Sequence, residues 1–558
     1  MTKWLERVQR LLGLTLDRAY SLGTRFPLVW LGLLLALQTL PLLESRELWF
    51  SDEIRYADAF RQMYENHKWL VLYLNGVFYP DKPPLYFWFL AAIKAATGLE
   101  GPALFAFGAA ASAFLFLSAT YALARQVLGV NRATSFAAGL VLLSVFYFIG
   151  LAHYSRMDLL FGTLIVASHI CLYRAWCKDH APWLAAIGGL LAGLATLTKG
   201  PLGLAFPLLS TLTWLLWRWR AGRLLRRDAL YALLAATLVP LLWVAAAFAL
   251  EDSAYLLNIF KEQIYRRATD TWHHAQPFWH YLLTLPAAWL PWTLVLAAVP
   301  LRRLASRPFW RGLYARRRAP GGLPYVWCMV ISGFALLSVV SIKIVVYLLP
   351  LFAPLAVLTG RQLASLTPAG MRRVYPAVAG LWVLVALALP WVNLAHPWPI
   401  RIAGLAPCAA LAALIAWLLF RFAPRLSPRS ALLLCAFATT LWALLAGAQL
   451  APSLDPIMSP KAQAVRMREY IELGYYPVGF RIYSGTYTWY AGRDIHETAD
   501  PDELAAILRS RPRVVLGMKK KHWDAWEDRP SGLRVIHEQW IADQPFVLVV
   551  QDGPGARI

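Results

Sequence analysis

Runs of about twenty apolar residues recur along most of this chain and constrain its fold more than any other feature. These runs fall near residues 27–45, 102–124, 133–152, 157–174, 182–198, 201–217, 229–250, 278–300, 324–341, 344–360, 374–394, 402–420 and 431–451. A helix of about twenty residues is long enough to cross the hydrocarbon core of a bilayer. Helices of a large soluble protein would instead be apolar along one side only. The sequence therefore predicts an α-helical polytopic membrane protein with about thirteen transmembrane helices.

The net charge of +23 would suit a nucleic-acid-binding protein, but its distribution does not. The basic residues gather in alternate loops, most densely in "RWRAGRLLRRD" (218–228) and "LRRLASRPFWRGLYARRRAP" (301–320). Membrane proteins carry such clusters in their cytoplasmic loops. We therefore expect no nucleic-acid partner, a cytoplasmic N-terminus and, with an odd number of spans, a C-terminus on the outer side of the membrane.

The ends and the cysteines of the chain predict neither processing nor a metal cluster. The basic first tail leads into the first span without an Ala-x-Ala-like cleavage site, so we expect this span to remain as an anchor. The five cysteines lie in or beside apolar segments, without a Cys-x-x-Cys pair. This pattern indicates no disulfide framework, and we expect no metal site and no cofactor.

The last part of the chain, from residue 452, has more charge and no long apolar run. "VGFRIYSG", "PRVVLGM" and "QPFVLVVQD" have the composition of short strands, and residues 501–511 that of a helix with a proline near its start. We therefore divide the chain into a transmembrane domain, residues 1–451 with a first periplasmic loop at 46–101, and a small periplasmic α/β domain, residues 452–558.

The predicted topology places a set of charged and polar residues together on the periplasmic side. An ionisable group beside a membrane span is costly and is therefore a functional-site hypothesis by default. The set comprises Asp52, Glu53, Arg55, Tyr79, Asp81, Lys82, Arg156, Asp158, Lys199, Glu262, Arg266, Arg267, His273, His274, Lys343 and Tyr347. Two acidic centres, several cations and hydrogen-bond donors suit a displacement at a phosphorylated carbon.

Each of these residues also has a purely structural interpretation. Asp52 and Glu53 suit the positive end of a helix capped by Ser51. Asp81 and Lys82 suit an ion pair in a turn that prolines hold rigid. Lys199 could reach the lipid headgroups from a Gly-Pro turn. A site of two histidines is not expected at residues 273–274, because adjacent residues do not share one side of a helix.

Several motifs resemble one family. "DEIRYADAFRQM" and "GVFYPDKPPLYFW" are similar to the first-loop motifs of the 4-amino-4-deoxy-L-arabinose lipid A transferases, glycosyltransferases of the GT-C type that use undecaprenyl-phosphate sugars. "LTKGPLGLAFP", "KEQIYRRA" with "HHAQPFWHY", and "SIKIVVYLLPLFAPLA" follow the later landmarks in order. The chain departs where the family shows Lys-Gly-Lys-Leu-Pro-x-Tyr, since only Lys343 and Tyr347 of that stretch are present, and Asp81 replaces a more usual Glu.

The resemblance implies a role for each central residue. Asp52 would be the essential acid beside the reacting carbon of the sugar, and Asp158 the second acid. Lys82 and Arg266 would hold the donor phosphate, Tyr347 would line its path, and Lys199 would add positive charge. Further members would contact substrate: Glu53, Arg55, Tyr79, Asp81, Glu262, His273 and Lys343.

The resemblance therefore predicts transfer of 4-amino-4-deoxy-L-arabinose from undecaprenyl phosphate to a lipid A phosphate at the periplasmic face of a bacterial inner membrane, with the C-terminus in the periplasm. The expected partners are this lipid donor, the lipid A acceptor and the bilayer, and we expect a monomer. One alternative is a GT-C enzyme with another sugar or with a protein hydroxyl as acceptor, where Asp52 acts as a base. A transporter would instead show charges near the midplane and an internal repeat.

Overall fold

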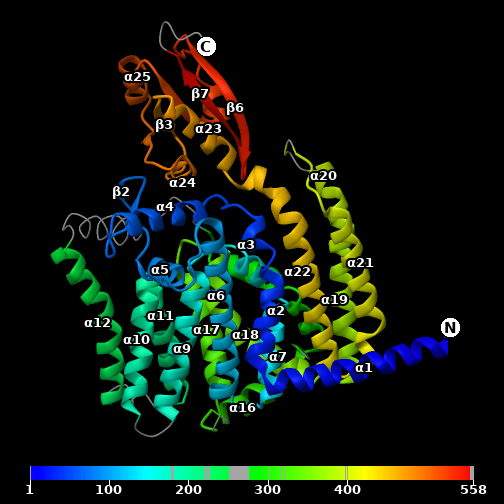
Figure 1. The fold of residues 1–558 in the computed structure, drawn as a ribbon. Helices are drawn as coiled ribbons and strands as arrows, with labels where there is room; N and C mark the ends of the chain where they lie inside the picture. The colour runs from blue at the N-terminus through cyan, green and yellow to red at the C-terminus, as the bar shows by residue number, and fades with distance from the viewer. Residues whose placement is uncertain are drawn as a thin grey trace.

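The computed structural model describes residues 2–177, 181–218, 222, 226–250, 276–299, 301–315, 317–319, 321–395, 398 and 400–552. It consists of a long helical bundle with a small α/β domain at one end (Figure 1). Helix α1 (Thr2–Arg25) crosses the opposite end of the bundle and projects beyond it.

The bundle follows the apolar runs of the sequence. Its helices before the most basic segments are α2 (Pro27–Thr39), α3 (Leu42–Ser45), α6 (Gly101–Leu123), η1 (Ala124–Leu128), α7 (Arg132–Leu143), α8 (Phe146–Ala152), α9 (Asp158–Cys177), α10 (Pro182–Lys199), α11 (Leu202–Trp217) and α12 (Arg227–Leu250). The later ones are α15 (His280–Ala288), η4 (Trp292–Ala298), η5 (Leu301–Ala305), α16 (Arg307–Ala315), α17 (Leu323–Val339), η6 (Val345–Leu348), α18 (Leu349–Ala364), α19 (Pro368–Ala388), η7 (Leu389–Trp391), α20 (Val392–Ala395), α21 (Leu405–Arg421), η8 (Ala423–Arg425) and α22 (Pro428–Met458).

Nine helices of the described residues are long and apolar enough to cross a membrane, and the number rises to eleven if each of two sharply bent helix pairs counts as one span. The predicted segments 201–217 and 324–341 form the shorter helices α11 and α17. The protein is thus a multi-span membrane protein, as predicted, but the count of thirteen is not confirmed. Helix α22 also runs seven residues past the expected domain boundary at 451, and its last turns accept hydrogen bonds from the first loop through Asp455 and the Met458 carbonyl.

The first long loop folds over the end of the bundle. It contains α4 (Asp52–Glu65), a two-stranded hairpin of β1 (Tyr73–Leu74) and β2 (Val77–Phe78), and α5 (Leu85–Thr97). Helix α4 buries most of its side chains between the bundle and the C-terminal domain. The expected cap does not form, since the Ser51 side chain makes no capping hydrogen bond. Ser51 has a helical backbone conformation, whereas a capping residue needs an extended one.

The C-terminal domain is a mixed five-stranded sheet in the order β4-β3-β5-β7-β6. The strands are β3 (Tyr476–Phe480), β4 (His496–Thr498), β5 (Val514–Lys519), β6 (Leu533–Ile541) and β7 (Gln544–Gln551), and the helices are α23 (Lys461–Glu472), α24 (Thr488–Ala491), α25 (Pro501–Ser510) and α26 (Lys520–Asp524). Strand β3 pairs in parallel with β4 and β5, while β7 pairs antiparallel with β5 and β6. The three predicted strands and the predicted helix are present, and β4 and β6 were not predicted.

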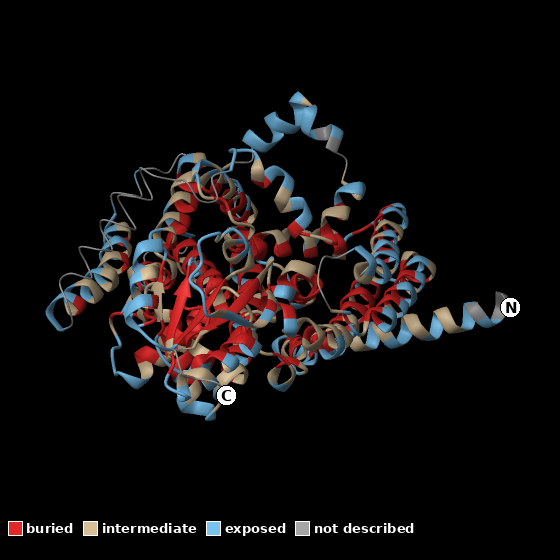
Figure 2. Ribbon diagram, turned by 90° about the horizontal axis from the view of Figure 1, so that it is seen from above, coloured by how far each residue is buried: buried red, intermediate tan, exposed pale blue. Residues whose placement is uncertain are grey.

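Hydrogen bonds between distant segments hold this domain on the first loop. The Asn75 side chain exchanges two hydrogen bonds with the backbone of Ile495, at 2.8 and 2.7 Å. The Asp455 carboxylate accepts from the Trp49 indole N–H at 2.6 Å and from the Glu47 amide at 3.1 Å. In the view from above, strands β3, β5 and β7 are largely buried, whereas most of β6 and the projecting half of α1 are exposed or half-buried (Figure 2). The first loop is therefore enclosed between two domains.

Candidate active site

Three segments meet beneath the C-terminal domain and supply the candidate active site: the start of α4, the stretch before α9, and the turn between α10 and α11. The turn requires two glycines. Gly200 has a φ of +84°, and a Cβ atom on Gly203 would lie 2.3 Å from the backbone nitrogen of Thr196. Glycine tolerates both situations because it lacks a Cβ. The sequence "TKGPLG" thus folds back tightly and places Lys199 at the mouth of the bundle.

The central feature is an alternating row of charges, the carboxylate–cation ladder of Asp52, Arg156, Asp158 and Lys199. Arg156 Nη2 lies 2.9 Å from Asp52 Oδ2, and Arg156 Nε donates to Asp158 Oδ2 at 3.1 Å. Lys199 Nζ donates to the other oxygen of Asp158. The ladder therefore joins the first loop to two membrane helices.

The ladder lies at a depth where unpaired charges would be costly. Asp158 is 2% exposed and the Lys199 side chain 9%, so both are nearly removed from water. Burial lowers the pKa of the Arg156 guanidinium, but the Asp158 and Asp52 carboxylates outweigh burial and raise that pKa above its usual value. Arg156 is thus a permanent cation held between two acids.

Two further predicted residues adjoin the ladder. Lys199 Nζ lies 4.2 Å from the ring centroid of Tyr347, which is a cation–π distance. Lys82 is close enough to interact electrostatically with both Asp158 and Lys199. The structure thus brings together Asp52, Asp158, Lys199, Lys82 and Tyr347, which the sequence places in four separate segments.

A second group forms the Arg55 cluster: the predicted residues Arg55, Tyr79 and Asp81, together with Tyr483 of the C-terminal domain. Arg55 Nη1 donates to the Tyr483 hydroxyl at 2.8 Å, and Arg55 Nη2 lies 3.6 Å from Asp81 Oδ2. The guanidinium carbon lies 4.4 Å from the ring centroid of Tyr483 and 5.0 Å from that of Tyr79. Burial raises the pKa of the Tyr79 phenol, so that it stays protonated.

Glu53 belongs to neither group, although it follows Asp52 directly. Its carboxylate receives two hydrogen bonds from Arg46, at 2.7 and 2.6 Å, and one from each backbone amide of Trp49 and Ser155, at 3.0 and 2.6 Å. Four donors occupy the capacity of one carboxylate, and the side chain is fully buried. This geometry favours the structural interpretation of Glu53, as a tie between the first loop and the stretch before α9.

Lys343 is directed at the end of α17 and not at the ladder. Its Nζ donates to the carbonyl oxygens of Val340, at 2.6 Å, and Gln276, at 3.0 Å. This arrangement favours a structural role for Lys343, which satisfies backbone carbonyls after the helix ends. The predicted site residues Glu262, Arg266 and His273 lie outside the described residues.

Two residues of the site were not among the predicted ones: Arg46 and Tyr483. Arg156 was expected on the same side of the membrane as Asp158, which follows it by two positions in "SRMD", but no role was predicted for it. Arg46 follows the first span directly, and a cation at such a position is readily explained by contact with the lipid headgroups. Tyr483 lies 428 residues from Arg55 in the chain, and no local pattern distinguishes it.

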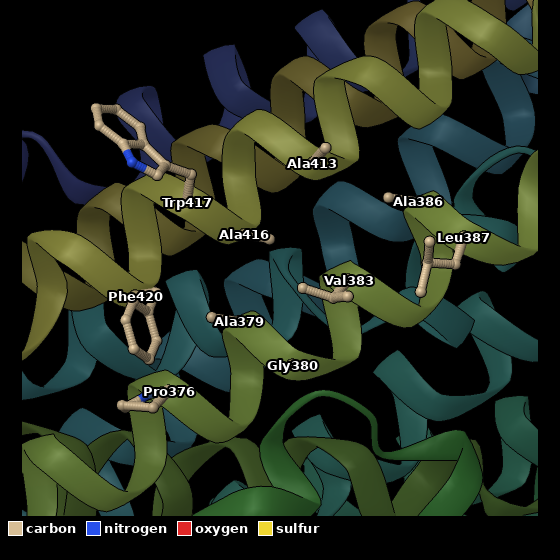
Figure 3. A pocket seen from close by; sticks show the side chains of 10 residues that line it. All are labelled: Pro376, Ala379, Gly380, Val383, Ala386, Leu387, Ala413, Ala416, Trp417 and Phe420. Atoms are coloured by element: carbon tan, nitrogen blue, oxygen red, sulfur yellow. The ribbon is translucent and has the colours of Figure 1, made fainter.

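A cavity of about 520 Å³ between α19 and α21 is a poor candidate for the reaction site (Figure 3). All ten side chains that line it, among them Trp417 and Phe420, are non-ionisable. Both aromatic residues are largely exposed on the outside of the bundle. The groove therefore suits apolar chains and lacks the charged side chains of the ladder.

Comparisons with known proteins show the family of the chain. Residues 81–246 match the family described as dolichyl-phosphate-mannose-protein mannosyltransferase. The undecaprenyl phosphate-alpha-4-amino-4-deoxy-L-arabinose arabinosyl transferase 1 of Sodalis glossinidius is 32% identical over 448 residues, 75% of each chain. The chain belongs to this arabinosyl transferase family. Its members are glycosyltransferases, and the ladder lies partly in the segment that matches the mannosyltransferase family.

Other relatives of the arabinosyl transferase family match shorter parts. The transferase of Edwardsiella ictaluri is 31% identical over 385 residues, 66% of this chain and 66% of that relative. The alignment with transferase 2 of Proteus mirabilis spans 60% of that relative. The crystal structure of ArnT from Cupriavidus metallidurans bound to undecaprenyl phosphate has a TM-score of 0.76 and 19% identity, covering 96% of this chain and 100% of that one. This likeness shows that the chain has the GT-C fold of that structure.

Proposed function

We propose that this protein transfers 4-amino-4-deoxy-L-arabinose from undecaprenyl phosphate to a phosphate of lipid A. The names of the arabinosyl transferase relatives support the sugar and the lipid carrier. The ladder carries the mechanistic part of the proposal, because it sets a carboxylate and two cations side by side at the mouth of two membrane helices. A lipid substrate can reach such a position from the bilayer.

The donor phosphate is the leaving group in this reaction. An oxygen of the acceptor phosphate forms a bond to the anomeric carbon while the bond from that carbon to the donor phosphate oxygen breaks. The electron pair of the broken bond goes to the undecaprenyl phosphate. Lys82 and Lys199 stabilise the charge that this phosphate gains, and Tyr347 lines its path. Arg266 is the further cation that the sequence predicts for this purpose.

Asp52 acts on the sugar. An acceptor phosphate is already anionic, so the reaction releases no proton that a strong base must remove. The Asp52 carboxylate, held by Arg156 at 2.9 Å, positions the amino-sugar and stabilises positive charge at the reacting carbon. Asp158 holds Arg156 and Lys199 in place between the two phosphates.

The orientation in the membrane is part of the proposal. Basic clusters in alternate loops support a cytoplasmic N-terminus and a C-terminal domain in the periplasm of a bacterial cell. A C-terminal alkaline phosphatase fusion, which is active only outside the cytoplasm, tests this orientation. An active fusion is expected, and an inactive fusion of full-length, membrane-inserted protein contradicts it.

Mass spectrometry of lipid A tests the activity. Lipid A from cells that produce the protein should carry the mass increment of aminoarabinose, and lipid A from cells that lack it should not. Asp52→Asn should abolish the increment at an unchanged protein level, whereas Arg466→Met, at a surface ion pair of the C-terminal domain, should retain it. The proposal fails if the increment is independent of the protein.

The match to the mannosyltransferase family favours one alternative, a GT-C enzyme that modifies a protein hydroxyl. A hydroxyl must lose a proton, so Asp52 would then act as a general base. The pH dependence of kcat separates the phosphate-acceptor reaction from the hydroxyl-acceptor reaction. A kcat that depends on the pKa of a single carboxylate supports the hydroxyl acceptor, and a kcat without this dependence supports the phosphate acceptor.

A further inference from the structure

The C-terminal domain contributes one side chain to the candidate active site. Tyr483 follows strand β3, stacks on the Arg55 guanidinium and accepts a hydrogen bond from it. The ring also contacts Phe50, with 5.7 Å between the ring centroids. Tyr483 is nevertheless 44% exposed, so that one side of the Arg55 cluster is open.

The Arg55 cluster contains more hydrogen-bond donors than its own residues use. Among the described residues, the buried Tyr79 hydroxyl and the buried Arg55 Nε have no hydrogen-bond partner. In the part of the chain that the structure describes, the Tyr483 hydroxyl accepts a hydrogen bond from Arg55 and donates none. Its own O–H proton is therefore available to a ligand. A buried donor without an acceptor costs free energy. The cluster is therefore complete only when a ligand supplies acceptor oxygens.

The unused groups define the chemistry of that ligand. All three are donors, and one belongs to a guanidinium, which binds phosphate in preference to neutral groups. Asp81 Oδ2 lies 3.6 Å from Arg55 Nη2, and Asp52 lies one turn before Arg55 on α4. Both carboxylates therefore also face the cluster. They offset part of the charge of Arg55 but leave its Nε edge available. The ligand is thus a phosphate with several acceptor oxygens.

The position of the cluster distinguishes it from the donor side of the site. Asp52 and Arg55 are three residues apart on α4 and share one side of the helix. Asp52 pairs on one side with Arg156, which leads to Asp158, Lys199 and Tyr347. The Arg55 cluster adjoins the C-terminal domain instead. Asp52 therefore lies between two groups of cations, as a sugar-binding carboxylate between two phosphates would.

We propose that Arg55, Tyr79 and Tyr483 form the subsite for the phosphate of the acceptor. This inference rests on the proposed function, since it assigns the second of the two phosphates in that reaction. It also gives the C-terminal domain a direct part in substrate binding, through Tyr483. The acceptor is then held by both domains, whereas the donor is held by the membrane domain.

Binding to the full-length protein in nanodiscs tests the subsite. The probes are bisphosphorylated lipid A, the same lipid A after phosphatase treatment, and undecaprenyl phosphate. Wild-type protein should bind the phosphorylated lipid A about tenfold more tightly than the treated form, since hydrogen bonds to a charged group are strong. Tyr79→Phe combined with Tyr483→Phe should remove this preference and leave the affinity for undecaprenyl phosphate unchanged.

Two controls keep the result interpretable. Tyr470→Phe changes a tyrosine of α23 outside the site and should behave as wild type. Tyr483→Phe alone alters an exposed hydroxyl, so the fold is retained, and it should reduce the preference several-fold. An unchanged preference in the double variant overturns the subsite. A parallel loss of affinity for undecaprenyl phosphate overturns its assignment to the acceptor. Absence of sugar transfer by the wild type, by contrast, refutes the proposed function without affecting the binding comparison.

Discussion

Removal of the Asp158 charge should destabilise the protein strongly, because this carboxylate separates two cations in a nearly dry environment. Arg156 Nε lies 3.1 Å from Asp158, which corresponds to an attraction of about 5 kcal/mol at an effective dielectric constant of about 20. Desolvation of the carboxylate offsets much of this attraction and of that to Lys199. The net loss for Asp158→Asn is therefore about 3 to 5 kcal/mol in the free energy of unfolding, as for other broken buried pairs.

Thermal unfolding of the purified protein in detergent measures this loss. An unfolding entropy of about 2.1 cal/mol/K per residue, applied to 558 residues, converts it to a fall of roughly 3 to 4 °C in the unfolding midpoint. Asp158→Asn combined with Lys199→Met should recover part of the fall, because the second change removes the cation left unpaired. Arg466→Met, at an ion pair whose side chains are about half exposed, should shift the midpoint by less than about 1 °C.

The reasoning would be refuted by a shift for Asp158→Asn no larger than that for Arg466→Met. If the shift of the double variant equals the sum of the shifts of Asp158→Asn and Lys199→Met alone, Asp158 and Lys199 are not coupled.

Three further predictions concern the surroundings of the ladder. His153 Nε2–H donates to the Gln38 carbonyl oxygen at 2.9 Å, and burial lowers the pKa of His153 to about 4. The folded state therefore binds a proton less readily than the unfolded state, whose pKa is about 6.5. Stability should therefore fall by at most about 3 kcal/mol as the pH decreases from about 6.5 to 4, and His153→Gln should flatten this dependence of the unfolding midpoint. Glu53→Gln should lower the free energy of unfolding by about 3 to 5 kcal/mol, because it leaves the Arg46 guanidinium buried without a counter-charge. A normal KM for the donor, measured on the variant that remains folded, would support the structural role of Glu53. Gly203→Ala should cost about 1 to 3 kcal/mol because its Cβ would overlap the Thr196 backbone, whereas Gly380→Ala, with open space around the Cβ, should stay within about 0.5 kcal/mol of wild type by the same unfolding assay.

The membrane class, the helical segments and the family could be predicted from the sequence because each is written locally. Apolar runs such as that of α6 are long enough to span a bilayer whatever surrounds them. The first-loop motifs likewise identify the family from a continuous stretch. Asp52, Lys82 and Asp158 could be proposed because charges beside spans are rare and hence informative.

Neighbouring charges were harder to separate. Asp52 and Glu53 are adjacent, yet one joins the ladder and the other is occupied by Arg46 and two backbone amides. Adjacent positions of a helix point in different directions, so their partners depend on which segments pack on each side. The same holds for Lys343. It matches the family motif in the sequence, but its ammonium group binds two backbone carbonyl oxygens.

The sequence by itself determined that this chain crosses a membrane, which family it belongs to and which loop gathers charges beside the spans, because hydropathy and motifs act over short stretches. Only the tertiary structure decided which charge pairs with which, and that Tyr483 reaches Arg55 across 428 residues of chain. Such pairing depends on the packing of whole domains against each other, and no local pattern encodes it. For this protein, that packing determines how the first loop is held between the membrane helices and the C-terminal domain.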